Sequence, residues 1–190
     1  AEKYFTPNNI RQPNRNRLLW RDSSVDGLKT GHTEASGYCL VASAQRRDMR
    51  LIAVVLGTDS DQARARETQK LLSYGFRNFE TQRLYESGAV LKEQVKVWYG
   101  QQDVVNLVLD QAVVLTFQRG SEKRLSAEVV VNSQLEAPLT KDQVLGSLRI
   151  SLDGELLLER PLVADRAIDK GGLFKRLKDW LTLFFTGLFG

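Results

Sequence analysis

"GYCLVASAQRRDMRLIAVVLGT", residues 37–58, contains two apolar runs separated by a short charged segment. Each run has the length and the β-branched content of a strand, and a brief polar connection between two such runs is typical of an antiparallel hairpin. The nearly continuous apolar character of residues 51–56 also predicts a strand that is covered on both faces. The stretch therefore predicts a hairpin within a packed sheet.

The segment before the hairpin, "VDGLKTGHT" at residues 25–33, has the pattern of another strand and holds the only histidine of the chain. A strand beside a cleft can bind an extended peptide main chain to main chain, and Gly31 has no side chain to obstruct it. The Thr30 hydroxyl can donate to a carboxylate, and the Lys29 charge favours a bound anion. An ordinary edge strand that runs into a turn, with His32 as a polar edge residue, also explains these residues. One His and one Cys cannot supply a three-ligand metal site, so neither a metal nor another cofactor is expected.

The segment after the hairpin changes to a helical period and predicts a helix over about residues 60–78. Asp59 or Ser60 provides the side-chain N-cap. The helix is expected to pack on the hairpin through one apolar stripe, formed by Ala63, Leu71, Leu72, Phe76 and Phe79.

Residues 83 to about 165 are predicted to be all-β. Four segments cluster β-forming residues at strand length: "VKVWY", "AVVLTF", "LSAEVVV" and "GSLRISL". Asp153-Gly154 lies between two such runs and is a strong signal for a hairpin turn. Several short strands with regular turns indicate a small sandwich or barrel.

The C-terminal segment "LFKRLKDWLTLFFTGLFG", residues 173–190, has large apolar residues at helical spacing. It follows Gly171-Gly172, which the sequence suggests is a hinge. A basic, aromatic-rich amphipathic helix at a terminus is typical of an anchor that lies in the plane of a membrane surface, and the stretch is too short and too charged to span a bilayer. The alternative is a helix that packs on the protein's own core. The predicted membrane-binding residues are Leu173, Phe174, Lys175, Arg176, Leu177, Trp180, Leu181, Phe184, Phe185 and Leu188.

The overall composition limits the class of protein. Hydrophobic residues make up 42% of the 190 residues, which is enough for a buried core, and the formal net charge is only +4. Basic and acidic residues alternate along most of the chain, so nucleic acid is not expected as a partner. The single cysteine, Cys39, excludes an internal disulfide.

Residues 16–58, "NRLLWRDSSVDGLKTGHTEASGYCLVASAQRRDMRLIAVVLGT", closely resemble the last part of the penicillin-binding domain in low-molecular-mass penicillin-binding proteins. These proteins are the serine-type D-alanyl-D-alanine carboxypeptidases of the penicillin-binding protein 5 and 6 group. The helix "RARETQKLLSYGFRNFET" is similar to the helix that follows in that family. "WYG", "NSQLEAPLTKDQVLGSL", "LDGE" and "RPLVA" resemble its all-β second domain, and the C-terminal segment resembles its membrane-anchoring helix.

The resemblance implies an α+β fold in three parts. Residues 1–82 would be the C-terminal part of a penicillin-binding, β-lactamase-like domain of antiparallel strands plus a helix. Residues 83–168 would form a small all-β sandwich domain, and residues 169–190 an amphipathic membrane-anchor helix.

The resemblance also implies an activity and roles for individual residues. In the family, a serine attacks the D-Ala-D-Ala peptide carbonyl, an acyl-enzyme forms, and penicillin acylates the same serine. Lys29 would give electrostatic support to this catalysis, Thr30 and Arg64 would bind the substrate carboxylate, and Gly31 and His32 would shape the substrate cleft. The alternative for Arg64 is a surface arginine that contributes only to solubility. The implied partners are peptidoglycan stem peptides that end in D-Ala-D-Ala, β-lactams and an anionic membrane surface. The implied location is peripheral, at the periplasmic face of the bacterial inner membrane.

The sequence departs from the family pattern in one respect. No serine has a lysine three positions after it, and no Ser-x-Asn or Tyr-x-Asn triplet occurs. We therefore expect the nucleophile, its base and the second motif to precede Ala1, the chain to be the C-terminal portion of the enzyme, and this portion to be inactive alone. The alternative is a non-catalytic β-domain that serves as a membrane-tethering module.

Overall fold

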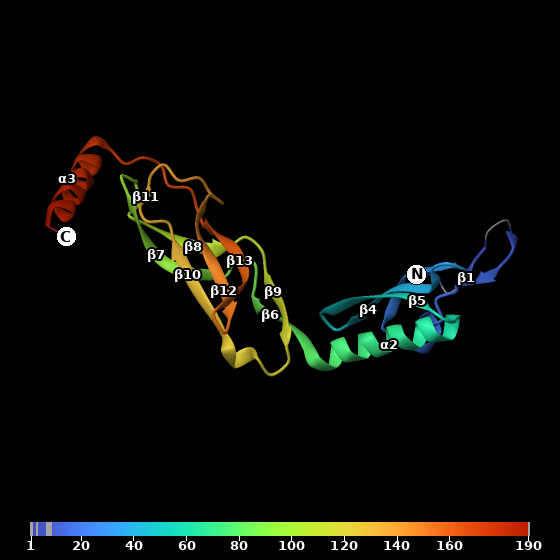
Figure 1. Cartoon of the computed structure of the whole chain (residues 1–190). Helices are drawn as coiled ribbons and strands as arrows, with labels where there is room; N and C mark the ends of the chain where they lie inside the picture. The colour runs from blue at the N-terminus through green and yellow to red at the C-terminus, as the bar shows by residue number, and fades with distance from the viewer. Residues whose placement is uncertain (1, 3, 7–8, 190) are drawn as a thin grey trace. The chain divides into compact units, whose positions relative to one another are not determined.

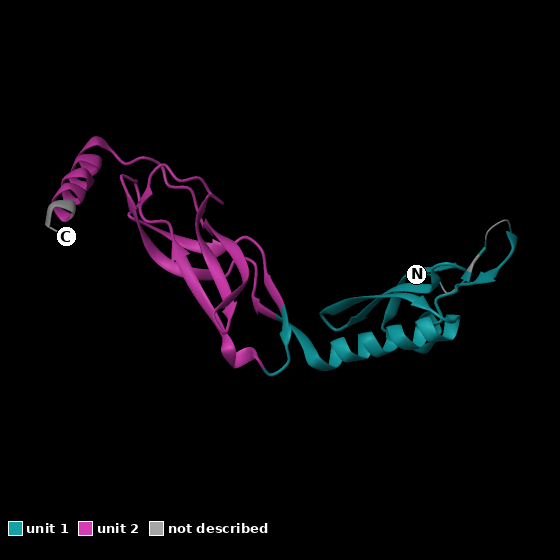
Figure 2. Ribbon diagram, in the orientation of Figure 1, with its two compact units in different colours: residues 1–82, 116–120 teal, residues 83–115, 121–190 magenta. Residues whose placement is uncertain are grey.

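The computed structural model describes residues 2, 4–6 and 9–189 and has an α+β fold, as predicted (Figure 1). The chain divides into two compact units (Figure 2). Unit 1 comprises Ala1–Gln82 with Thr116–Gly120, and unit 2 comprises Arg83–Leu115 with Ser121–Gly190. The domain limits expected from the sequence stay predictions.

Unit 1 is built on a three-stranded antiparallel sheet with the strand order β3-β4-β5. The predicted hairpin is confirmed, since β4 and β5 pair with Val41 opposite Val54 and Arg46 opposite Met49. The predicted helix is α2, and Ser60 caps it by accepting a hydrogen bond from the Ala63 amide at 3.0 Å. The elements of unit 1 are β1 (Tyr4–Phe5), β2 (Gln12–Pro13), α1 (Leu18–Arg21), β3 (Val25–Thr33), β4 (Gly37–Arg46), β5 (Met49–Thr58) and α2 (Asp61–Asn78).

The buried face of α2 agrees only in part with the predicted stripe, since Leu72 is buried and Phe76 is partly buried against the same core. The helix buries Arg64, Ala65, Thr68 and Leu72, whereas Leu71 and Phe79 are exposed. Positions 65, 68 and 72 are separated by three and four residues, so they share one face, and Leu71 is turned about 100° away from Leu72. The face that packs on β4 and β5 is therefore set by small residues and one leucine.

The other face of β5 is open in this chain, so the expectation that residues 51–56 are covered on both faces is wrong. Ala53 is buried in the core beneath α2, but Ile52, Val54 and Leu56 are 54–69% exposed. Side chains alternate along a strand, and α2 covers only one face of the sheet. The core of unit 1 consists of Leu18, Leu19, Val25, Leu40, Ala42, Ala44, Ala53, Ala65 and Leu72.

Unit 2 is dominated by a six-stranded sheet with the order β10-β12-β13-β8-β7-β11. Asp153 and Gly154 have φ values of 52° and 87° and form the predicted turn between β12 and β13. Buried apolar residues that include Leu107, Leu148 and Leu162 form its core. The remaining elements of the chain are β6 (Phe79–Tyr85), β7 (Val90–Trp98), β8 (Val104–Leu109), β9 (Val113–Gln118), the short helix η2 (Glu122–Arg124), β10 (Leu125–Val131), β11 (Leu135–Glu136), β12 (Val144–Leu152), β13 (Glu155–Ala164) and α3 (Leu173–Phe189). Strands β6 and β9 form a separate two-stranded sheet.

Candidate functional site

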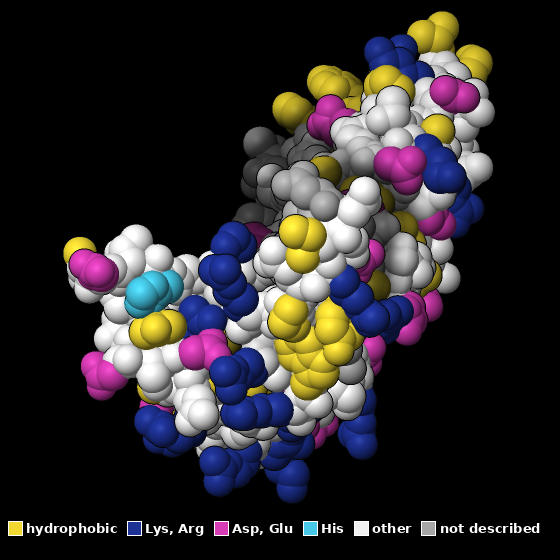
Figure 3. Space-filling model, turned by 90° about the vertical axis from the view of Figure 1, so that its right-hand side faces the viewer, with side chains coloured by type: hydrophobic (Ala, Val, Ile, Leu, Met, Phe, Trp, Pro, Cys, Tyr) yellow, Lys and Arg dark blue, Asp and Glu magenta, His cyan; other side chains and the backbone are white. Residues whose placement is uncertain are grey.

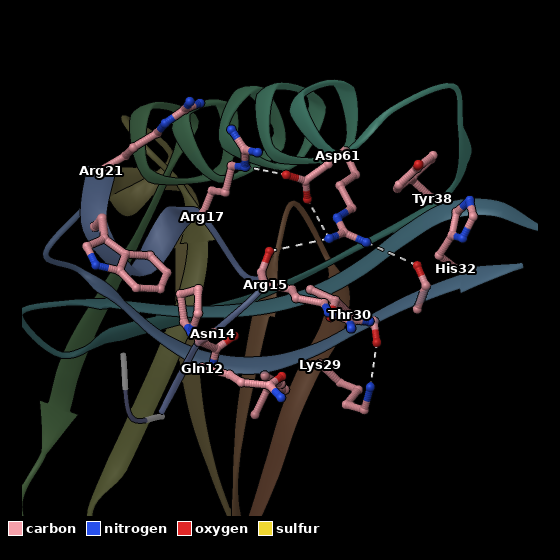
Figure 4. Close-up of a pocket in the computed structure, with 15 residues that line it drawn as sticks. Gln12, Asn14, Arg15, Arg17, Arg21, Lys29, Thr30, His32, Tyr38 and Asp61 are labelled. Carbon is pink, nitrogen blue, oxygen red and sulfur yellow. Dashed lines mark hydrogen bonds and ion pairs between the residues drawn. The ribbon is translucent and has the colours of Figure 1, made fainter. Parts of the chain in front are cut away.

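The Lys-Thr-Gly triplet lies on β3, which is an edge strand among the described residues, because β4 is its only neighbour in the sheet. An open cavity of about 1120 Å³ lies beside this edge, and we call it the β3 groove (Figure 4). Strand β3 contributes Leu28, Lys29, Thr30, Gly31 and His32 to its lining. The other lining residues are Gln12, Pro13, Asn14, Arg15, Arg17, Trp20, Arg21, Tyr38, Asp61 and Arg64.

Lys29 and Thr30 both face this groove and not a sealed interior. Lys29 is exposed, Thr30 is half-buried, and the Lys29 ammonium donates to the Thr30 carbonyl at 2.5 Å (Figure 4). An ammonium has three N–H donors, so this single hydrogen bond leaves capacity for a ligand. The pair therefore presents a positive charge and a hydroxyl at the sheet edge.

His32 and Tyr38 lie opposite each other on β3 and β4, and their rings are in contact, with centroids 3.9 Å apart and planes tilted by 41°. Cross-strand pairs of this kind stabilise a sheet on one face. The two rings line the groove at the end of the triplet (Figure 4). This arrangement makes His32 a wall of the groove.

Arg64 of α2 connects several backbone segments that line the groove. Its side chain is about 5% exposed, and its guanidinium donates to the carbonyls of Gly31 at 3.1 Å and Cys39 at 3.5 Å. It also donates to the Arg15 carbonyl at 3.3 Å and to Asp61 at 2.5 Å. These contacts use four of the five N–H groups of an arginine, so the geometry makes Arg64 a residue that positions β3 and adds positive charge.

Arginines of the segment before β3 also line the groove, and the sequence analysis did not single them out. Arg15, Arg17 and Arg21 join Lys29 and Arg64, while Asp61 is the only acidic residue among the described lining residues. Asp61 forms ion pairs with both Arg17 and Arg64. Figure 3 shows many Lys and Arg side chains on the face turned toward the viewer. The excess of positive charge favours an anionic ligand. The three arginines at positions 15, 17 and 21 are the sequence feature that could have pointed to this part of the groove.

Gly31 is not required by the packing of this chain, which leads to a prediction. Among the described atoms, a Cβ at Gly31 would meet only the Cys39 Cβ at 3.6 Å, which is an ordinary contact. Gly37, by contrast, has a φ of 62°, and its Cβ would lie 2.9 Å from the Thr58 carbonyl oxygen. We expect Gly31→Ala to change the free energy of unfolding by less than about 1 kcal/mol, and Gly37→Ala to lower it by about 1–2 kcal/mol or more.

Amide hydrogen exchange of β4 in increasing urea measures both variants within unit 1. A large loss of stability in Gly31→Ala would mean that the glycine serves the fold, and would remove the argument that it leaves room for a peptide.

Helix α3 of unit 2 presents its apolar side chains to solvent. Leu173 and Phe174 are 80% and 91% exposed, and Leu177, Trp180, Leu181, Phe184 and Phe185 are 41–56% exposed. Trp180 and Phe184 stack with centroids 5.7 Å apart. The alternative, a helix packed on the protein's own core, would bury these apolar side chains, and the structure does not show that burial. The side chain of Leu188 lies outside the described ones.

Basic residues of α3 divide between two faces. At 100° per residue, Arg176 and Lys178 lie on either side of the apolar stripe that centres on Leu177 and Phe184. Lys175, which the sequence groups with the membrane-binding residues, instead forms ion pairs with Asp103 and Asp179. Of the helices within the described residues, none is long and apolar enough to cross a membrane.

Comparisons with known proteins give a consistent family. Residues 79–170 match the family model "Penicillin-binding protein 5, C-terminal domain", and residues 1–60 match the model "D-alanyl-D-alanine carboxypeptidase". The chain is 46% identical over 191 residues to D-alanyl-D-alanine carboxypeptidase DacC of Escherichia coli (strain K12). This alignment covers 100% of the chain and 48% of DacC. DacA of the same organism is also 46% identical over 191 residues, with 47% of its length covered.

A solved structure agrees with the sequence matches. Penicillin-binding protein 5 from Haemophilus influenzae is 41% identical, with a TM-score of 0.78 over 89% of this chain and 50% of that one. The chain thus spans about half the length of the relatives it matches. It belongs to the penicillin-binding protein 5 family of D-alanyl-D-alanine carboxypeptidases.

Proposed function

We propose that this chain supplies one wall of the active site of a serine-type D-Ala-D-Ala carboxypeptidase. The observation that carries the proposal is the position of Lys29, Thr30 and Gly31 on an open edge strand that faces a groove rich in positive charge. A stem peptide that ends in D-Ala-D-Ala is both an extended peptide and an anion, so one ligand uses both features.

The substrate would lie beside β3 as an additional strand. Main-chain groups of an edge strand are available for such pairing, and Gly31 leaves room for the close approach. The Thr30 hydroxyl would donate to the terminal carboxylate of the peptide, and His32 with Tyr38 would close one end of the groove. Arg64 would act through its hold on the Gly31 carbonyl and through its charge.

Lys29 would stabilise negative charge near the reacting carbonyl. A fixed positive group in a partly shielded site favours the anion that forms when a nucleophile attacks a peptide carbonyl. The nucleophile itself has to come from a Ser-x-x-Lys motif, which this sequence does not contain. The catalytic cycle therefore has three parts: attack by that serine, release of D-alanine with formation of an acyl-enzyme, and hydrolysis by water. A β-lactam would acylate the same serine.

A hybrid protein tests this proposal. The part of E. coli DacA that precedes the region matched by this chain would be joined to the chain, and DacA itself would serve as the control. We expect a fluorescent penicillin to label the hybrid covalently, and the hybrid to release D-alanine from a peptide that ends in D-Ala-D-Ala. The chain alone should remain unlabelled. Labelling of the chain alone, or a folded hybrid without labelling, would contradict the proposal.

A second proposed function is membrane tethering by α3 at the periplasmic face of the inner membrane. It is supported by the exposed apolar stripe of α3, with Arg176 and Lys178 at its margins. Aromatic side chains enter the boundary between headgroups and acyl chains, and cations near anionic lipids add about 1 kcal/mol each. The helix would lie in the plane of the surface with its stripe in the lipid.

A further inference from the structure

The polar face of α3 is tied to the connection between β7 and β8 by a buried carboxylate. Asp179 is 4% exposed, and its Oδ2 accepts a hydrogen bond from the Tyr99 amide at 2.8 Å. The Lys175 ammonium bridges Asp179 at 2.6 Å and Asp103 at 2.7 Å. We call these four residues the α3 clamp. All of them belong to unit 2.

The backbone before α3 is also held in place. The Gly171 amide donates to the Tyr99 carbonyl at 2.7 Å, and Lys170 forms a β-bridge with Gly100. A Cβ at Gly171 would lie 2.8 Å from the Gly100 carbonyl oxygen, so this glycine permits a close approach of two backbones. The hinge expected at Gly171-Gly172 stays a prediction, although these contacts hold the Gly171 backbone against Tyr99 and Gly100.

The clamp and the apolar stripe lie on opposite sides of the helix. Successive residues in an α-helix are rotated by about 100°, so Lys175 and Asp179 are separated by about 40°. Leu177 and Phe184 are separated from Lys175 and Asp179 by about 140–180° around the helix axis. The helix is thus bound to the β-domain through its polar face, and the apolar residues point away from that domain.

The electrostatics of the clamp favour its charged form. Burial alone would raise the pKa of Asp179, but hydrogen bonds from Lys175 and the Tyr99 amide outweigh it, so the pKa lies below its ordinary value. Burial alone would lower the pKa of Lys175, but hydrogen bonds to Asp103 and Asp179 raise it. Lys96 also pairs with Asp103 at 3.2 Å. Two cations and two carboxylates therefore balance around Asp179, the buried charge of the group, whereas Asp103 and Lys96 remain largely exposed.

We propose that the α3 clamp fixes the direction of the membrane helix relative to the β-domain, so that the apolar stripe is presented outward to a lipid surface before any membrane is met. Lys175, Asp179 and Asp103 act as positioning residues. The role of the clamp in presenting the stripe to lipid rests on the membrane tethering proposed above. The clamp itself can be tested without a membrane. Without these contacts, the exposed stripe would be free to turn toward the apolar core of the β-domain.

Hydrogen exchange of the Tyr99 amide in solution is the first test. In Asp179→Ala this amide loses an ionised acceptor, and its exchange should accelerate about 10- to 100-fold. Lys175→Met, which keeps the aliphatic stem, should produce a smaller acceleration in the same direction. The matched control is Asp169→Ala, an exposed aspartate just before α3, which should leave the Tyr99 amide unchanged. Unchanged protection of Val105 and Leu107 in β8 shows that the sheet is intact.

A distance measurement tests the direction of the helix. Spin labels at Lys178→Cys on α3 and Glu128→Cys on β10, in a Cys39→Ser background, should give one narrow distance distribution. The width of that distribution should increase at least about twofold in Asp179→Ala and should not change in Asp169→Ala. The reason is that a helix without the Asp179 contacts can adopt more orientations relative to the sheet. A broad distribution in the parent chain, or no change in Asp179→Ala, would overturn the proposal.

Binding to vesicles separates the clamp from the tethering function. Asp179→Ala retains the whole apolar stripe and should bind vesicles of phosphatidylglycerol and phosphatidylethanolamine within about threefold of the parent chain. Absence of binding by the parent chain would remove the tethering proposal, whereas the exchange and distance results would still decide for or against the clamp.

Discussion

A chain in which Phe174, Trp180 and Phe184 are all replaced by serine is expected to lose affinity for anionic vesicles by about 10²- to 10⁴-fold. The exposed fractions of the three side chains are 91%, 53% and 51%, so together they expose about two full aromatic side chains. Burial of one such side chain contributes about 1.5–3 kcal/mol, and each 1.4 kcal/mol is a tenfold change in affinity. Sedimentation with vesicles over a range of lipid concentrations measures the loss.

The control for this triple variant carries serine on the opposite face of the same helix. Thr182 and Thr186 are exposed, and their hydroxyls bond to backbone carbonyls within α3. Thr182→Ser with Thr186→Ser should therefore bind like the parent chain. Circular dichroism of all variants checks that the helix is retained. Equal binding by the triple variant and the control would show that the apolar stripe does not enter the lipid.

Local signals in the sequence predicted the elements whose formation depends on neighbouring residues. The β4–β5 hairpin follows from two apolar runs around a charged connection, the start of α2 from the Ser60 cap, and the β12–β13 turn from Asp153-Gly154. Each of these features depends on a few adjacent residues, so no knowledge of distant contacts is needed.

Burial was harder to predict because it depends on distant neighbours. Leu71 and Leu72 are adjacent and equally apolar, but only Leu72 faces the sheet, and the residue types alone do not distinguish them. The open face of β5 has the same cause, since apolar periodicity does not say which elements cover a strand. The α3 clamp joins Tyr99 to a residue 80 positions away, and no pattern in either segment signals that contact.

The sequence located only the part of the candidate site that consists of consecutive residues, because the other part depends on contacts between distant residues. Lys29, Thr30, Gly31 and His32 are consecutive, so a strand necessarily brings them to one edge. Arg15, Arg17 and Arg21 reach the groove through the packing of α1 and the segment before it, for which no element was predicted from the sequence. Arg64 was singled out as a substrate-binding residue, which stays a prediction; the structure places it in the lining of the groove, and its bonds to three backbone carbonyls could be seen only in the structure.

Replacement of Lys29 by glutamine in the hybrid with E. coli DacA is expected to slow acylation by penicillin about 10²- to 10³-fold. Glutamine keeps much of the length and polarity of the side chain but removes the charge. Loss of one fixed donor from the site that stabilises a developing oxyanion has an effect of this size. The exposed position of Lys29 on β3 means that the substitution leaves no buried group without a partner, so the fold should be unaffected.

Single-turnover labelling with a fluorescent penicillin gives the acylation rate, and Lys92→Gln, an exposed lysine of the β-domain, is the matched control. Thr30→Val should slow labelling by about 10- to 100-fold, since it removes a hydrogen bond to an ionised carboxylate. A β-lactam and a peptide substrate both carry that carboxylate, so the Thr30→Val effect should appear with either. If Lys29→Gln labelled as fast as Lys92→Gln, the groove would contribute only shape, and the charge beside β3 would have no part in the attack.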